Sequence, residues 1–246
     1  LVEARRTLDA LCTQAREERR AFIYRGRLLQ RLGDAQGALR DYKRAVELDE
    51  KYGAAYNAMG YALLALGKSD EALQAFNRYV QLSPKEANAH DSLAGLHLRR
   101  GELGAAVDSA RKALELDGKF LPAAAKLGDA LLFQGKAPIA RKAYGAMESS
   151  EDPAQHHEGA MRAARSYLFD GPGLGSNRAM ADAERALLSE AEVARKARRG
   201  ADQVHALAEL ARLQIERVSL FDAGRTLQAL GEVLQPSARA AAKDEK

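Results

Sequence analysis

A repeated spacing of 34 residues is the sequence feature that most constrains how this chain can fold. Glycine and alanine recur at this interval in two columns: Gly33, Gly67, Gly101 and Gly135, and Ala38, Ala72, Ala106 and Ala140. Glycine makes up 20 of the 246 residues. A chance match at three further positions therefore has odds of roughly one in two thousand. The chain is a tandem repeat, and its fold follows from what one repeat can form.

The repeat that spans residues 53–86 has the pattern of two helices. Small or apolar residues recur three or four apart in each half, which places them on one face of a helix. These residues are Tyr56, Met59, Gly60 and Leu63, and then Ala72, Ala75, Phe76 and Tyr79. Between the halves, Gly67 can take the left-handed conformation that ends a helix, and Ser69 can cap the next helix. The repeat is predicted to form a helical hairpin.

Such a hairpin needs neighbours of its own kind. Gly60 and Ala72 lack bulk, so the two helix axes can approach each other closely. A unit of 34 residues is smaller than the domains that usually fold alone. Its outer apolar face must therefore be covered by the next repeat, and the sequence predicts an all-α stack of hairpins.

These residues resemble the tetratricopeptide repeat. The family pattern is found at Tyr56, Met59, Gly60, Leu63, Gly67, Lys68, Ala72, Phe76, Tyr79 and Pro84. Three positions depart from it: Tyr79 replaces a small residue, Arg25 an apolar one and Ala110 an aromatic one. The resemblance implies an α-solenoid of antiparallel helix pairs that form a right-handed superhelix.

The frame divides the chain into five parts. Residues 1–18 match the second helix of a truncated repeat, so we infer that the protein continues upstream, and residues 19–154 form four repeats. Residues 155–203 form a divergent repeat, with an extended loop at 170–176 and a long second helix at 177–199. Residues 204–237 form a C-terminal repeat, and 238–246 are a charged tail.

No set of residues indicates catalysis or a cofactor. His156, His157 and Glu158 are adjacent, whereas ligand pairs on a helix are three or four apart, so we expect an exposed polar helix start rather than a metal site. His205 is expected to be solvated. The glycine-rich loop at 171–176 lacks the Lys-Ser/Thr of a phosphate-binding loop and follows a predicted helix. The single Cys12 can form no internal disulfide, and no stretch approaches 18 consecutive apolar residues.

The family resemblance implies a concave groove lined by the first helix of each repeat. Carried over position by position, its residues are Arg20, Ile23, Arg27, Gln30, Arg31, Asn57, Tyr61, Leu64, Asn88, Asp91, Leu98, Arg99, Lys126, Asp129, Leu132 and Phe133. Leu64, Leu98 and Leu132 recur at the period and form an apolar strip. The alternative is that these leucines seal adjacent first helices against one another. The clamp of lysine, arginine and asparagine with which some relatives hold a C-terminal carboxylate is missing in either repeat frame.

Positive charge is concentrated at the N-terminal end. Residues 1–32 hold eight arginines and four acidic residues, a difference that equals the net charge of +4 of the whole chain. An acidic peptide or helix could dock there. The alternative is that these arginines cover the solvated faces of two helices.

The function predicted from these features is a non-catalytic scaffold or adaptor that binds a peptide or helical segment of another protein. An alternative is a docking or regulatory domain of a larger multidomain enzyme or of a cell-envelope assembly factor. Nucleic acid is disfavoured as a partner, because the arginines lack interleaved aromatic residues beyond Phe22 and Tyr24. The sequence indicates neither an oligomeric state nor a compartment.

Overall fold

The structure is a computed structural model that describes residues 2–14, 18–169 and 177–216, together with residues 226, 227, 229, 230 and 233. The chain divides into two compact units, the N-terminal unit of residues 1–126 and the C-terminal unit of residues 127–246. Every regular element within the described residues is an α-helix or a 3-10 helix. The prediction of an all-α solenoid of helix pairs is confirmed.

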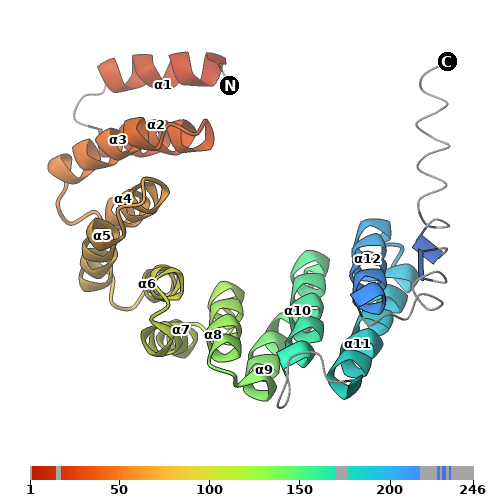
Figure 1. Cartoon of the computed structure of the whole chain (residues 1–246). Coiled ribbons are helices and arrows are strands. Elements are labelled where there is room, and N and C mark those ends of the chain that lie inside the picture. Colours follow the sequence, from red (N-terminus) through yellow and green to blue (C-terminus); the bar gives the residue numbers. More distant parts are fainter. Residues whose placement is uncertain are drawn as a thin grey trace, which may run out of the picture. The chain divides into compact units, whose positions relative to one another are not determined.

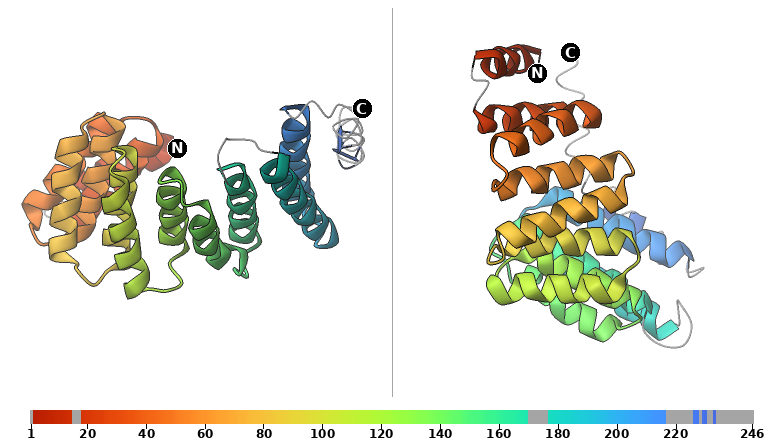
Figure 2. Two further views of the ribbon diagram at one scale, coloured as in Figure 1. Left: turned by 60° about the horizontal axis from the view of Figure 1, so that its bottom comes forward. Right: turned by 90° about the vertical axis from the view of Figure 1, so that its left-hand side faces the viewer.

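The N-terminal unit is a stack of antiparallel helices. Its helices are α1 (Val2–Gln14), α2 (Arg19–Arg31), α3 (Ala35–Leu48), α4 (Gly53–Ala65), α5 (Ser69–Leu82), α6 (Ala87–Arg99), α7 (Leu103–Leu116) and the first part of α8 (Leu121–Phe133). Successive helices from α2 to α7 lie side by side (Figures 1 and 2). The helices that begin at residues 19, 53, 87 and 121 start 34 residues apart, which is the period of the sequence.

The C-terminal unit contains the rest of α8, α9 (Ala137–Glu148), α10 (Pro153–Ser166), a 3-10 turn at Tyr167–Phe169, α11 (Asn177–Lys196) and α12 (Gly200–Glu216). Helix α11 has 20 residues, against 12 to 14 for the helices from α2 to α10. The loop expected at 170–176 lies outside the described residues, as does the tail at 238–246. Of the repeat expected at 204–237, the described part is mainly α12, which begins at Gly200.

The same glycine turn joins the two helices of each regular hairpin. Gly33, Gly67, Gly101 and Gly135 have φ values of +84°, +74°, +72° and +75°, in the left-handed region that favours glycine. In each turn the amide of the following residue reaches back five residues; Lys68, for example, donates to the Leu63 carbonyl at 2.9 Å. The predicted cap at Ser69 is wrong, because Ser69 is the first helical residue and its neighbour Lys68 occupies the capping position without a side-chain bond.

Glycine also sets the distance between the paired helices. A Cβ atom on Gly60 would lie 2.6 Å from Cε1 of Phe76, and one on Gly128 would lie closer still to Cε1 of Tyr144. These distances are too short for any real contact, so each aromatic ring rests on bare backbone. The hairpin of α6 and α7 has Ala94 and Ala110 at the equivalent positions, both fully buried. The hairpin of α6 and α7 thus lacks both the aromatic ring and the glycine beneath it.

Arg25, which departs from the family pattern, is explained by its partners. Its guanidinium donates two hydrogen bonds to the buried Asp41 of α3, at 2.8 and 2.7 Å, and one to Asp9 of α1 at 3.2 Å. A charge at an apolar position is tolerated because it is paired and hydrogen-bonded on both sides. This single side chain links α1, α2 and α3.

We expect Gly60→Ala to lower the free energy of unfolding of the N-terminal unit by about 1–3 kcal/mol, because the new methyl group must displace the Phe76 ring. The midpoint of urea denaturation followed by circular dichroism measures this change. The matched control is Gly104→Ala in α7, where a Cβ meets nothing within 4 Å. That variant should be unchanged or more stable by up to about 1 kcal/mol, from the higher helix propensity of alanine.

The same contact predicts coupling between the two residues. In a Phe76→Ala background, Gly60→Ala should cost much less than it does alone, because the double variant reproduces the pair found at Ala94 and Ala110. Equal costs in both backgrounds would show that the ring does not set the spacing.

Candidate functional site

A cavity of about 350 Å³ in the N-terminal unit collects five of the predicted groove residues. Arg27 and Gln30 come from α2, Asn57 and Tyr61 from α4, and Asn88 from α6. Its volume falls within the range of sites that bind small groups. The first helices of three successive hairpins therefore present polar side chains to one hollow.

Two tyrosines from second helices also line this cavity, where the repeat pattern did not predict them. Tyr42 donates to Oε1 of Gln30 at 3.1 Å. Tyr79 donates to Oε2 of Glu86 at 2.6 Å and accepts from Nδ2 of Asn88 at 3.1 Å. Burial raises the pKa of Tyr79 to about 12, and the bond to Glu86 acts in the same direction. The signal was present in the sequence, since Tyr79 stands where the family pattern has a small residue.

A chain of hydrogen bonds ties α4 to α6 beside the cavity. Tyr61 donates to the hydroxyl of Ser92 at 3.1 Å, and Ser92 donates to Oδ1 of Asn57 at 2.9 Å. The ring of Tyr61 packs edge-on against Phe76, with centroids 5.1 Å apart. These contacts fix the orientation of the Asn57 amide, whose nitrogen has no partner among the described residues.

Arginines form an exposed stripe on α2. Arg20, Tyr24, Arg27 and Arg31 lie four, three and four residues apart, which places them along one face of the helix, and all four are exposed. None of these three arginines forms an ion pair with a residue in the described ranges. Arg99, at the end of α6, is exposed as well. The stripe thus borders the cavity with unpaired positive charge.

The other charged candidates are paired within their own unit. Asp91 is 4% exposed and accepts two bonds of 2.8 Å from Lys126, which links α6 to α8. Asp129 accepts from Arg162 of α10 at 2.6 Å and from Tyr144 at 2.9 Å. Burial raises the pKa of Asp91, and Lys126 acts in the opposite direction. These side chains hold helices together and have little capacity left for a partner.

The apolar candidates differ in exposure. Ile23 is 2% exposed and lies in the core of the N-terminal unit, and Leu64 packs against that core. Leu98 and Leu132 are half-buried. Phe133 is 67% exposed, the highest value among the exposed large apolar residues.

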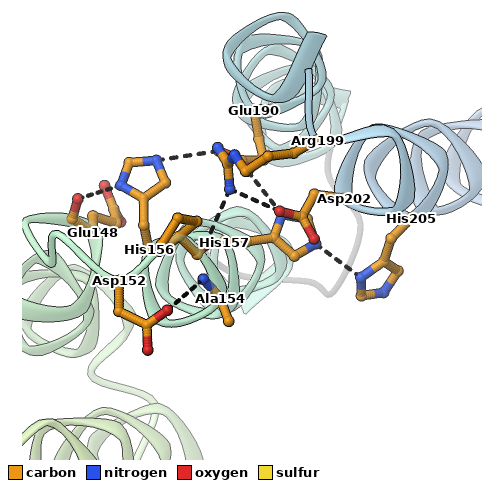
Figure 3. A network of polar contacts seen from close by, with 10 residues as sticks. Glu148, Asp152, Ala154, His156, His157, Glu190, Arg199, Asp202 and His205 are labelled. Carbon is orange, nitrogen blue, oxygen red and sulfur yellow. Dashed lines mark hydrogen bonds and ion pairs between the residues drawn. The ribbon is translucent and has the colours of Figure 1, made fainter. Parts of the chain in front are cut away.

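The expectation for His157 is wrong, because this residue is buried rather than part of an exposed helix start. Only 7% of it is exposed, since α11 covers the beginning of α10 and brings Glu190 to 2.7 Å from Nδ1 of His157 (Figure 3). On its other side, Nε2 of His157 lies 3.0 Å from Nδ1 of His205. His205 is exposed, but it is held by this contact. The sequence around the adjacent histidines contains no signal for the contact of His157 with Glu190, which lies 33 positions away.

The described ranges offer neither a metal site nor a membrane span. Within them, no three or more His, Cys, Asp or Glu side chains are arranged to hold a metal ion. None of the helices found there combines the length and the hydropathy needed to cross a bilayer.

A model of a known family matches part of the repeated region of the chain. Residues 24–87 and 57–119 each match the family model of the tetratricopeptide repeat. A comparison with curated protein sequences finds no match.

Solved structures of similar architecture include proteins described as tetratricopeptide repeat proteins. The C-terminal part of such a protein from Cytophaga hutchinsonii is similar over 93% of this chain and 90% of its own, with 14% identity and a TM-score of 0.67. MamA is similar over 69% of this chain and 96% of its own, with 25% identity and a TM-score of 0.56. YrrB, described as a protein of this type with an unusual peptide-binding site, covers 73% of this chain and 91% of its own, at 19% identity and a TM-score of 0.55.

Lys126→Met should destabilise the N-terminal unit by about 2 kcal/mol at pH 7, because it leaves the Asp91 carboxylate buried without its cation. This cost lies below the roughly 3–5 kcal/mol of fully buried pairs, since Lys126 keeps 25% side-chain exposure. Lys126 lowers the pKa of the buried Asp91 carboxyl, so its loss raises that pKa further in the folded variant, and a falling pH relieves the cost of the buried charge more in the variant than in the wild type. The deficit relative to the wild type should therefore shrink as the pH falls from 7 toward 4, which urea denaturation at both pH values will measure.

Lys112→Met is the control for this variant. Lys112 pairs with Glu115 on the exposed face of α7 at 2.9 Å, and such surface pairs contribute less than about 1 kcal/mol. A cost for Lys126→Met that equals this control, or that grows on acidification, would contradict the role given to Asp91.

Proposed function

We propose that this chain, a tetratricopeptide repeat protein, is a non-catalytic scaffold that binds a peptide or helical segment of another protein in the cavity of its N-terminal unit. The observation that carries the proposal is the convergence of Arg27, Gln30, Asn57, Tyr61 and Asn88 on one hollow. Stacked helical hairpins form extended surfaces of this kind, which such proteins use for binding.

The amide side chains of the cavity suit the main chain of a bound segment. The bond from Ser92 to Asn57 occupies the Asn57 oxygen and leaves its nitrogen as a donor. The bond from Asn88 to Tyr79 uses the Asn88 nitrogen and leaves its oxygen as an acceptor. One donor and one acceptor, fixed on neighbouring helices, match the alternating groups of a peptide backbone. YrrB, which has the same fold and is described as having a peptide-binding site, supports this use of the architecture.

The charge beside the cavity favours an acidic partner segment. Arg20, Arg27 and Arg31 face solvent without carboxylate partners among the described residues, whereas Asp91 and Lys126 neutralise each other. An acidic segment would gain charge-assisted bonds to the arginines and would be attracted from a distance. The same segment would meet no unpaired carboxylate among the residues that line the cavity.

Selection from a random library of 12-residue peptides, displayed to the intact chain, tests the proposal. The selected peptides should be enriched in Asp and Glu, and their affinity by fluorescence anisotropy should fall about fivefold for Arg27→Gln, as expected for one lost ion pair. The affinity should fall as salt increases. Tyr61→Ala should also weaken binding, because it removes a wall of the cavity and the bond to Ser92.

Arg111→Gln is the matched control. Arg111 is exposed on α7, forms no ion pair with a described residue and lies outside the cavity, so its loss changes the net charge equally. Selected peptides that bind the Arg27, Tyr61 and Arg111 variants equally well would show that the cavity is not the binding site.

A further inference from the structure

A second cavity, of about 480 Å³, lies in the C-terminal unit between α9, α10 and α11. Five of the twelve residues in its wall are small, and a Cβ on Gly145 would meet nothing within 4 Å. These small residues are Gly145, Ala160, Ala163, Ala186 and Ser189. Side chains of this size on three facing helices leave a space that larger residues would fill. The cavity shares no residue with the one in the N-terminal unit.

The two ends of this cavity carry opposite charges. Arg141 and Lys142, from the first half of α9, lie at one end, where the Arg141 guanidinium stacks 4.1 Å from the centre of the Tyr167 ring. Glu148, from the end of α9, and Glu190, from α11, lie at the other end. A ligand group therefore meets positive charge on one side and negative charge on the other.

Glu190 is already engaged by groups around it. Its Oε1 lies 2.7 Å from Nδ1 of His157 and 3.8 Å from Nη2 of Arg199, and its Oε2 lies 3.5 Å from Nε2 of His156 (Figure 3). Only 3% of its side chain is exposed. Glu190 thus links α11 to α10 and to Arg199, which follows α11, and it is a structural carboxylate.

Glu148 is different. Its backbone carbonyl accepts a hydrogen bond from Nδ1 of His156, but its carboxylate has no hydrogen bond or ion pair with a described residue (Figure 3). Burial raises the pKa of the Glu148 carboxyl; His156 opposes this effect and Glu190 adds to it. A half-buried carboxylate without a partner costs free energy, which a cation that enters the cavity would offset.

We propose that this cavity binds one basic side chain, a lysine or arginine of a partner protein, with its cationic group against the Glu148 carboxylate. The aliphatic stem of that side chain would lie along the small residues of the wall, as long basic side chains do on apolar surfaces. Arg141 and Lys142 at the other end disfavour a second basic residue there. The site goes beyond the function proposed above and uses different residues, so each can fail without the other.

Titration of the intact chain with capped tripeptides, followed by ¹H–¹⁵N NMR, tests the proposal. The probes are acetyl-Ala-Lys-Ala-amide, its Gln analogue and its Glu analogue. The lysine probe should cause saturable shifts confined to residues 142–148, 156–163 and 186–193, with an affinity about fivefold above that of the glutamine probe, as for one ion pair in a partly buried site. The glutamate probe should bind no better than the glutamine probe at these residues.

Glu148→Gln should remove the preference for the lysine probe, while Glu151→Gln should keep it. Glu151 is exposed, lies three residues away and does not line the cavity, so its loss is the same change of charge outside the site. The proposal is overturned if the lysine and glutamine probes bind alike, if shifts scatter over the surface, or if the two variants behave in the same way.

A stability measurement separates a binding role from a structural one. A carboxylate that serves the fold would make Glu148→Gln less stable than the wild type. If the carboxylate serves ligand binding instead, Glu148→Gln should be as stable as the wild type or more stable, because the variant lacks the unpaired half-buried charge. We expect the second result in thermal denaturation, and a lower melting temperature for Glu148→Gln than for both the wild type and Glu151→Gln would overturn the proposal.

Discussion

The contact of an aromatic ring with bare backbone is the interaction that brings the paired helices together in the hairpins of α4 with α5 and of α8 with α9, whereas two alanines take its place between α6 and α7. Phe76 rests on Gly60 and Tyr144 on Gly128, at distances that no Cβ could occupy. This contact brings the two axes close enough to bury both faces in a pair of helices of only 13 and 14 residues.

Polar contacts between neighbouring hairpins determine where charge is left for a partner. Asn57 and Tyr61 are bonded to Ser92, Asp91 to Lys126 and Asp129 to Arg162, at sequence separations of 31 to 35 residues. Each bond links a first helix to the next first helix within its own unit. The charges of Asp91, Lys126 and Asp129 are therefore neutralised internally, whereas Arg20, Arg27 and Arg31 of α2 keep theirs exposed. The repeat pattern predicts equivalent first helices, but these helices differ in how much unpaired charge they expose.

Most of the fold could be predicted from the sequence, because it follows from local rules. The period, the turn glycines and the close approach of the two helices at Gly60 each depend on residues within 34 positions. The small residues Gly60 and Ala72 predicted that approach, whereas the structure places the ring of Phe76 against Gly60. The candidate site was predicted less completely. Arg27, Gln30, Asn57, Tyr61 and Asn88 do line one cavity, but Ile23 and Asp91 are buried, and Tyr42 and Tyr79 enter from second helices. Which side of a helix a neighbour covers depends on packing angles that the repeat pattern does not contain. The link from His157 to Glu190 was missed for the same reason, since it joins helices of the divergent repeat.

The recurring left-handed turn bears on how such a protein can change its length. The bond from Lys68 to Leu63 has counterparts from Asp34 to Leu29 and from Glu102 to His97, all at 2.9 Å. The turn of every hairpin in the N-terminal unit is thus closed by a bond between residues of that hairpin. Duplication or deletion of one whole 34-residue repeat would keep the turn of every remaining hairpin. It would change only the interface between the two hairpins that become neighbours. Arrays of this construction can grow or shorten in evolution by whole units, while the residues on the inner face diversify independently.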